Sequence, residues 1–211
     1  MSPRKKKYPD YGENQHVYIP SKGFVFLTAG KVASGVLKEI GRAVEGELLK
    51  IGTKEAASLH NAGAQTLALY RNPIERLESC YRDKIKRHYY KGFRSMNIKP
   101  GISFNDFAKR VCDIPDDKAD GHFRSMSCFY LDSEGDPIFD RLISLSDFGN
   151  YYEEIFRAEN DGFPPLPPAK TVTRDKPGLE VDPLNKNTLD KLIERYSNDL
   201  YLEGYLWKVG E

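Results

Sequence analysis

A lysine set among small residues stands where an apolar run gives way to an amphipathic segment. The stretch reads Thr-Ala-Gly-Lys-Val-Ala-Ser-Gly-Val over residues 28–36. Small residues let the backbone approach a ligand closely, and successive N–H groups at the start of a helix favour an anion. Lys31 adds a positive charge and Ser34 a hydroxyl donor. These residue types in this order predict a loop that binds a phosphate-like group.

This loop differs from the G-x-x-x-x-G-K-[ST] loop that binds nucleoside triphosphates. Val25 stands where that motif needs its first glycine, and Val32 stands where it needs a hydroxyl residue. The next apolar run ends in Tyr70 and Arg71, without an Asp placed to hold Mg²⁺. We therefore expect an anionic ligand that is bound without a metal ion.

A second group of candidate anion ligands follows the apolar run at residues 66–70. Arg71 comes at the end of that run, where open α/β sheets bind their ligands. Spacing of three and four residues then places Ser79, Arg82 and Lys86 on one stripe of the next predicted helix. A guanidinium, a hydroxyl and further cations suit a second phosphate. Two such groups in neighbouring strand–helix units predict one ligand with two separated anionic groups.

The elements that must hold these residues follow an α/β pattern. Residues 24–29 and 66–70 are apolar runs typical of buried strands. Each precedes an amphipathic helix, the first from Ser34 and the second from Pro73, with Asn72 as its cap. Strand, turn and helix, repeated in this way, predict an α/β fold with a central, mainly parallel sheet flanked by helices in three layers.

The second half of the chain is less regular. Its predicted elements are helices over about residues 104–111, 146–159 and 188–201 and a strand over 138–143. The last helix is expected to bury one face, made of Leu189, Leu192, Ile193, Tyr196 and Leu200. Residues 161–185 contain six prolines, which predicts an irregular loop.

Composition limits the class of protein. A chain of 211 residues with 39% hydrophobic residues is too apolar to be disordered, and it predicts one domain over residues 21–211 after a basic N-terminal extension over 1–20. No apolar run reaches membrane-spanning length, and none follows the N-terminal lysines as in a signal peptide. We therefore expect a soluble, cytoplasmic protein without a membrane span. Three widely spaced cysteines without a C-x-x-C motif predict neither disulfides nor a zinc site.

Charge is balanced over the whole chain but not locally. The formal net charge is +1, which gives no indication of nucleic-acid binding. Residues 82–99 nevertheless hold seven Lys or Arg against one acid, whereas residues 113–161 hold thirteen acids against four basic residues. A local basic block in a neutral protein indicates an anionic ligand, and a solvated helix face is the alternative interpretation.

Taken together, these motifs resemble sulfotransferases that use 3′-phosphoadenosine 5′-phosphosulfate (PAPS), and they are most similar to the carbohydrate-sulfotransferase-like family. Residues 31–36 resemble that family's 5′-phosphosulfate loop. Residues 70–84, Tyr-Arg-Asn-Pro-Ile-Glu-Arg-Leu-Glu-Ser-Cys-Tyr-Arg-Asp-Lys, resemble its 3′-phosphate motif. Gly35 and Val36 depart from the family loop, which usually has Thr or Ser there. Weaker similarity continues at residues 122–124, 138–143 and 196–200.

The resemblance implies a P-loop-NTPase-like fold and a definite reaction. The sulfuryl group of PAPS would pass in line to a hydroxyl of an acceptor, a carbohydrate by family resemblance, without a metal ion. Lys31 would stabilise the charge that develops on the leaving phosphate, and the loop and Arg71 would each hold one phosphate. The residues implied to bind PAPS are Lys31, Val32, Ala33, Ser34, Gly35, Val36, Arg71 and Ser79.

The acceptor hydroxyl also needs a general base. His60 is the first candidate, because it lies between the two motifs and a neutral imidazole accepts protons near neutral pH. Glu55 and His122 are the alternatives, and each of the three is open to a purely structural role. His16 and His88 are expected at the surface.

The basic block gives the acceptor a chemical character. Residues 82–99 also contain Tyr89, Tyr90 and Phe93, whose rings offer faces for stacking on sugars, so an acidic glycan is the expected acceptor. Two other functions stay open. One is a small-molecule kinase of the P-loop class, and the other is a non-catalytic module that binds a nucleotide or nucleic acid through the basic block.

Overall fold

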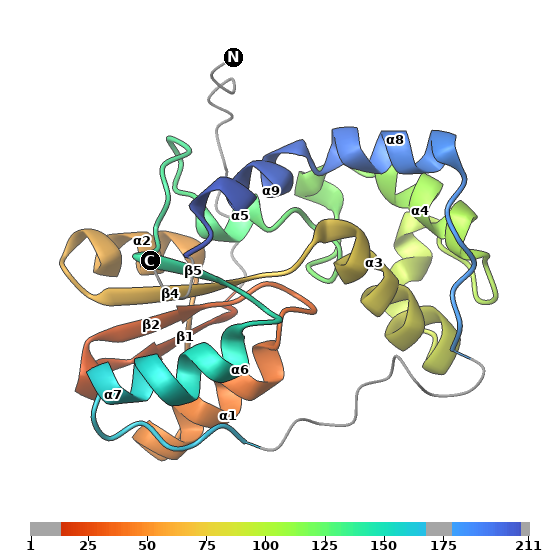
Figure 1. Ribbon diagram of the computed structural model, residues 1–211. Helices are drawn as coiled ribbons and strands as arrows, with labels where there is room; N and C mark the ends of the chain where they lie inside the picture. Colours follow the sequence, from red (N-terminus) through yellow and green to blue (C-terminus); the bar gives the residue numbers. More distant parts are fainter. Residues whose placement is uncertain (1–13, 168–178, 208–211) are drawn as a thin grey trace. The chain divides into compact units, whose positions relative to one another are not determined.

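The computed structural model describes residues 14–167 and 179–207. The chain divides into two compact units, which we describe separately (Figure 1). Unit 1 comprises Met1–Arg71, Met126–Pro168 and Leu202–Glu211. Unit 2 comprises Asn72–Ser125 and Ala169–Tyr201. The loop and Arg71 fall in unit 1, and Ser79 falls in unit 2.

Unit 1 is an α/β structure built on an open sheet of five strands, which confirms the predicted class. The strands are β1 (His16–Ile19), β2 (Phe24–Leu27), β3 (Leu49–Ile51), β4 (Gln65–Tyr70) and β5 (Arg141–Ser144). Their order in the sheet is β3-β1-β2-β4-β5. β2, β4 and β5 pair in parallel, as predicted, but β1 pairs antiparallel with both β2 and β3. The sheet is therefore mixed.

The antiparallel half of the sheet comes from a hairpin that the sequence patterns did not indicate. β1 uses residues 16–19, part of the stretch assigned above to an N-terminal extension, and residues 1–13 lie outside the described part of the chain. A short 3₁₀ turn, Pro20–Lys22, leads to Gly23, whose φ of 58° suits glycine. Val17 then pairs with Phe26, so the hairpin register places both apolar side chains in the core.

Helices flank the sheet of unit 1 (Figure 1). They are α1 (Ser34–Glu45), α2 (Thr53–Asn61), α5 (Ser127–Tyr130), α6 (Phe148–Asn150) and α7 (Arg157–Glu159), with a 3₁₀ turn at Leu202–Tyr205. A π-helical stretch, Tyr151–Phe156, joins α6 to α7, so the helix predicted over 146–159 forms but begins at Phe148. α1 packs closely on β1, because a Cβ on Gly41 would lie 2.5 Å from Cγ1 of Val17.

Unit 2 is helical. Its elements are α3 (Pro73–Tyr81), a π-helical stretch (Arg82–Arg87), 3₁₀ turns at Lys91–Met96 and Asp116–Lys118, α4 (Phe104–Cys112), α8 (Lys186–Arg195) and α9 (Ser197–Tyr201). Asn72 caps α3 as predicted, since its side chain accepts the backbone N–H groups of Ile74 and Glu75. Fully buried rings of Phe93, Phe107 and Phe123 pack together in the core.

The C-terminal helix predicted over 188–201 is two helices. α8 ends at Arg195 and α9 begins at Ser197, with Tyr196 buried at the break. Leu192 is buried as predicted, but the expectation for Ile193 is wrong, because 45% of it is exposed. In the predicted proline-rich loop, residues 161–167 and 179–185 contain no helix or strand, and residues 168–178 lie outside the described part of the chain.

A buried ion pair crosses the interior of unit 2. Arg76 of α3 is 1% exposed and Asp199 of α9 is 0% exposed, and Nη2 of Arg76 lies 3.7 Å from Oδ2 of Asp199. The same Nη2 donates to the carbonyl of Arg124 at 2.5 Å, and the guanidinium lies over the ring of Tyr196. The charge of Arg76 is thus compensated in the core rather than exposed to a ligand.

His16 contradicts its predicted surface position, because it is completely buried in β1. Its Nδ1 accepts the backbone N–H of Thr28 at 3.0 Å, and its Nε2 lies 3.2 Å from Oγ1 of Thr53. Nδ1 is therefore unprotonated and Nε2 carries the hydrogen. Burial lowers the pKa of His16 from 6.5 to about 3.

The buried imidazole predicts a loss of stability in acid. Below pH 6.5 the unfolded chain binds a proton at His16 that the folded chain does not bind until about pH 3, so falling pH favours unfolding across this range. By pH 5 the contribution of His16 alone amounts to about 2 kcal/mol. Urea unfolding between pH 5 and 7.5 measures it. His16→Asn, which keeps an acceptor for Thr28, should flatten the dependence, whereas exposed His88→Asn should not; equal slopes for all three proteins would contradict the assignment.

Candidate functional site

The loop between β2 and α1 has an unusual backbone. Lys31 has a φ of 70° and Ala33 a φ of 53°, a region that residues with a Cβ rarely adopt. Between them Val32 is completely buried, which anchors the loop in the core of unit 1. When left-handed and right-handed backbone conformations alternate, successive N–H groups turn toward one side and form an anion-binding concavity. The strain at two non-glycine residues fits a loop shaped for a ligand.

The loop leads into the N-terminus of a twelve-residue helix. Ala33 is the N-cap, and its carbonyl accepts the N–H groups of Val36 and Leu37 at 2.8 and 3.2 Å. The N–H groups of Ser34 and Gly35 are in the first turn, where the helix has no carbonyl four residues earlier to accept them. They are therefore directed outward from the start of the helix. A Cβ added to Gly35 would meet nothing within 4 Å, so space is open above this position. The positive end of the helix dipole adds to the attraction for an anion.

Arg71 joins this loop at the same edge of the sheet. It follows β4, the parallel neighbour of β2, and its Nη1 donates to the carbonyl of Lys31 at 3.3 Å. Its side chain is partly buried. The structure therefore brings the two predicted basic residues of unit 1, Lys31 and Arg71, together at the carboxyl ends of two adjacent strands, where open α/β sheets bind ligands.

His16 also supports the loop, and the sequence did not reveal this role. The hydrogen bond from Thr28 to Nδ1 of His16 fixes the first residue after β2, and Oγ1 of Thr28 donates to the carbonyl of Gln15 at 2.7 Å. The signal available in the sequence was weak. A lone histidine between Gln15 and Val17 resembles a surface residue until the hairpin partner β2 is known.

Ser79, the remaining predicted phosphate ligand, is partly buried in α3 of unit 2. Arg82, one position into the π-helical stretch, pairs with Glu78, with Nη2 of Arg82 3.0 Å from Oε2. Lys86 is exposed. Because the helix changes from α to π at Arg82, the stripe predicted through Ser79, Arg82 and Lys86 does not continue as a straight α-helical row.

His60 lies at the opposite edge of the sheet from Lys31, so the structure does not bring these two predicted catalytic residues together. It ends α2 just before β4 begins, whereas Arg71 follows the end of β4. At about 3.3 Å per residue, the two ends of that strand are about 16 Å apart. The structure therefore does not place His60 where a hydroxyl attacking a group bound by Lys31 would lie.

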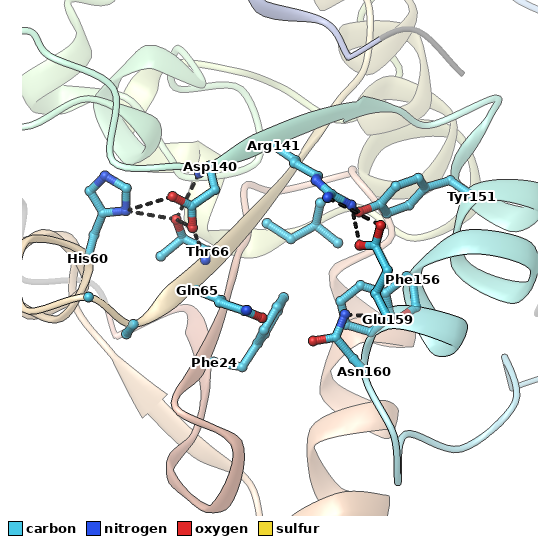
Figure 2. Close-up of a pocket in the computed structure, with 13 residues that line it drawn as sticks. Phe24, His60, Gln65, Thr66, Asp140, Arg141, Tyr151, Phe156, Glu159 and Asn160 are labelled. Atoms are coloured by element: carbon cyan, nitrogen blue, oxygen red, sulfur yellow. Dashed lines mark hydrogen bonds and ion pairs between the residues drawn. The ribbon is translucent and has the colours of Figure 1, made fainter. Parts of the chain in front are cut away.

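The surroundings of His60 are a compact polar cluster at the amino ends of β4 and β5 (Figure 2). Oδ2 of Asp140 accepts the backbone N–H of Thr66 at 2.7 Å and its hydroxyl at 3.0 Å, while Nδ1 of His60 lies 2.9 Å from that hydroxyl oxygen. Because the Thr66 hydrogen goes to the carboxylate, Nδ1 of His60 must be the donor. Thr66 and Asp140 are functional-site candidates that sequence reasoning missed.

The other two candidates for the base have different surroundings. Glu55 is exposed in the first turn of α2, which begins near His16. In unit 2, Nδ1 of His122 lies 2.5 Å from Oδ1 of Asp120, which also accepts the backbone N–H of His122. Burial opposes ionisation of Asp120, but these hydrogen bonds hold its pKa below the usual value. An ionised Asp120 fixes the hydrogen on Nδ1 and leaves Nε2 of His122 as the proton acceptor.

Comparisons with known proteins add no assignment. Comparison of the chain with protein-family models, curated proteins and solved structures finds no significant match. Over residues 14–167 and 179–207, no three His, Cys, Asp or Glu side chains group as metal ligands. Within the same ranges, every helix is too short or too polar to cross a membrane.

Proposed function

We propose that the protein is a sulfotransferase that binds PAPS at the carboxyl edge of the sheet in unit 1 and that its fold is of the P-loop-NTPase-like kind. The observation that carries the proposal is the contact between Arg71 and the carbonyl of Lys31. It joins, in one place, the two sequence motifs that resemble the phosphate-binding motifs of this enzyme class. The parallel pairing of β2 with β4 supports the fold assignment.

The chemistry assigned to the loop follows from its charges and dipoles. In-line sulfuryl transfer, like phosphoryl transfer, depends mainly on positioning and on stabilising the charge that develops on the leaving phosphate. Lys31 supplies a full positive charge there, and the N–H groups of Ser34 and Gly35 supply fixed dipoles that need no rearrangement. Arg71 binds the 3′-phosphate through charge-assisted hydrogen bonds. Ser79 and His122 lie in unit 2, so their roles in 3′-phosphate binding and as the base stay predictions, and Glu55 stays a candidate base in unit 1.

Calorimetric titration with 3′-phosphoadenosine 5′-phosphate, in the presence of a chelator, tests the nucleotide site. We expect binding by the wild-type protein and a loss of about 30- to 1000-fold in affinity for Arg71→Ala, as for other buried charge contacts. Arg157→Ala removes an arginine of helix α7 that pairs with Glu153, and this variant should bind like wild type. No binding, or equal binding by Arg71→Ala, would refute the proposal. Turnover of ATP with Mg²⁺ instead would indicate the kinase alternative.

The basic segment of unit 2, residues 82–99, supports an acidic acceptor. Arg82 and Lys84 pair with Glu78 and Asp83. Five further cations are exposed and have no ion-pair partner within the described residues: Lys86, Arg87, Lys91, Arg94 and Lys99. Of the aromatic residues expected to stack on sugars, Tyr90 is 40% exposed, but Phe93 is completely buried and cannot take that role.

Neutralising this segment should weaken binding of the acceptor without affecting the nucleotide. For the triple variant Lys86→Ala, Arg87→Ala and Lys91→Ala, we expect the KM for a uronate-containing or sulfated glycan to rise about tenfold at low salt. Affinity for 3′-phosphoadenosine 5′-phosphate should stay unchanged. The triple variant Lys109→Ala, Lys186→Ala and Lys191→Ala removes the same charge from exposed positions elsewhere in unit 2. An equal rise in KM for both variants would show that net charge alone is responsible.

A further inference from the structure

A cavity of about 380 Å³ lies at the amino ends of β2, β4 and β5, on the opposite edge of the sheet from Lys31 and Arg71 (Figure 2). All the residues that line it belong to unit 1. An adjoining hollow shares Gly63, Ala64, Gln65 and Asn160 with it. The volume is in the range of small-molecule sites and suits a ligand of about ten to twenty non-hydrogen atoms. The proposed reaction makes no use of this cavity.

The lining combines an apolar wall with two separate polar groups. Phe24, Leu67 and Phe156 form the apolar part. As Figure 2 shows, His60, Thr66 and Asp140 lie on one side of Phe24 and Gln65, and Arg141, Tyr151 and Glu159 lie on the other. An apolar wall with a few convergent polar side chains is the usual composition of a site for a small organic molecule.

The arginine in this cavity already has its partners. Nη1 of Arg141 lies 2.6 Å from Oε2 of Glu159 and donates to the hydroxyl of Tyr151 at 2.9 Å. Its guanidinium also lies over the ring of Trp207. The positive charge of Arg141 and the negative charge of Glu159 thus compensate each other, and neither calls for an ionic ligand.

Asp140 is different, because within the described residues neither Lys nor Arg forms an ion pair with it. Oδ2 accepts the two hydrogen bonds from Thr66, whereas Oδ1 lies 3.8 Å from Nδ1 of His60. That Nδ1–H donates to the Thr66 hydroxyl, so its hydrogen is not directed at Oδ1. The side chain of Asp140 is 52% exposed and is held rigidly by β4. Arg141 and Glu159 offset each other, so among the carboxylates and the guanidinium that line the cavity one negative charge remains, on Asp140.

We propose that this cavity binds a small organic cation, with a primary ammonium group at Oδ1 of Asp140 and its body within the cavity. A carboxylate that is fixed by backbone and hydroxyl donors is preorganised to accept N⁺–H hydrogen bonds. A cavity of this size with apolar side chains in its lining favours an amine with an organic body over an inorganic cation. The side-chain amides of Gln65 and Asn160 can bond a polar group at the far end of the ligand. This inference is independent of the proposed sulfotransferase activity.

Three compounds that share one framework test the charge requirement on the wild-type chain. Tyramine is a cation, 4-hydroxyphenethyl alcohol is neutral, and 4-hydroxyphenylacetate is an anion. We expect tyramine to bind with a dissociation constant of about 0.1–1 mM, which is usual for a ligand of this size. The alcohol should bind at least about tenfold more weakly and the acid more weakly still. Amide ¹H–¹⁵N shifts of Gly63, Gln65 and Thr66 locate the site during the titration.

Two variants assign the effect to Asp140. Asp140→Asn keeps an oxygen for the Thr66 N–H but removes the charge, and it should weaken tyramine binding about tenfold or more. Asp147→Asn is the matched control. Asp147 lies after β5, at the other edge of the sheet, and like Asp140 its carboxylate accepts a hydrogen bond from a hydroxyl group, that of Ser144. Equal affinity for the three compounds, no shifts at 10 mM tyramine, or unchanged binding by Asp140→Asn would overturn the proposal. The first two of these outcomes need no variant, so a folding defect in Asp140→Asn leaves the test decisive.

Discussion

Replacing Lys31 with methionine should lower kcat for sulfuryl transfer by about 10²- to 10³-fold, the usual effect of removing one donor that stabilises a developing negative charge. Methionine follows the lysine side chain as far as Cε but lacks the ammonium group, and like lysine it has a Cβ. The backbone at φ 70° is therefore equally strained in both proteins. Because Lys31 is only partly buried, the free energy of unfolding should change by less than about 1 kcal/mol.

Lys31→Gly separates charge from backbone strain in the same experiment. Glycine adopts a positive φ without steric cost, so relief of strain offsets its entropy loss, and the variant should be as stable as wild type or up to about 1 kcal/mol more stable. It should nevertheless lose activity as fully as Lys31→Met. Single-turnover rates with saturating PAPS, together with urea unfolding, measure both effects. An active Lys31→Gly variant would show that the shape of the loop, and not the ammonium group, is responsible for catalysis.

The Arg76–Asp199 pair should produce the largest effect on stability. Asp199→Asn leaves the guanidinium of Arg76 buried without its anion, and we expect a loss of about 3–5 kcal/mol in the free energy of unfolding. The carbonyl of Arg124 and the ring of Tyr196 remain in contact with the guanidinium, but neither supplies a full negative charge. Urea unfolding of the full chain, followed by circular dichroism, measures the loss.

An exposed pair in the same unit provides the control. Lys186 and Asp190 of α8 form an i,i+4 pair whose side chains are 91% and 57% exposed, so Asp190→Asn should change stability by no more than about 0.5 kcal/mol. Arg76→Met combined with Asp199→Leu removes both charges and should recover much of the lost stability. A loss below 1 kcal/mol for Asp199→Asn would contradict the prediction that Asp199 compensates the charge of Arg76 in the core.

Much of unit 1 and the start of unit 2 could be predicted because their signals are local. Asn72 and Pro73 mark a helix start by hydrogen bonding and by a fixed φ, which depend on few neighbours. The helix from Ser34 has a strong apolar stripe, and Leu37 and Ile40 are buried as that stripe requires. β1 was missed because its stability comes from pairing with β2 and β3, and such pairing leaves no local pattern in four residues.

The position of His60 was available in principle from chain topology. A crossover between parallel strands must bring the chain back to the amino edge before the next strand begins. His60 precedes β4 by five residues and Asp140 directly precedes β5, so both belong to the amino edge. Lys31 and Arg71 follow their strands and belong to the carboxyl edge. Closeness to two motifs along the sequence was therefore a misleading guide to closeness in space.

The π-helical stretches have a consequence for how this chain is aligned with others. A π-helical turn contains one residue more than an α-helical turn, so it acts as a one-residue insertion that a helix absorbs without forming a loop. Arg82–Arg87 and Tyr151–Phe156 are two such places. A relative that lacks the extra residue in either stretch would have an ordinary α-helix there. Its alignment with this chain would need a single gap inside an uninterrupted helix, a position where gaps are normally penalised most heavily.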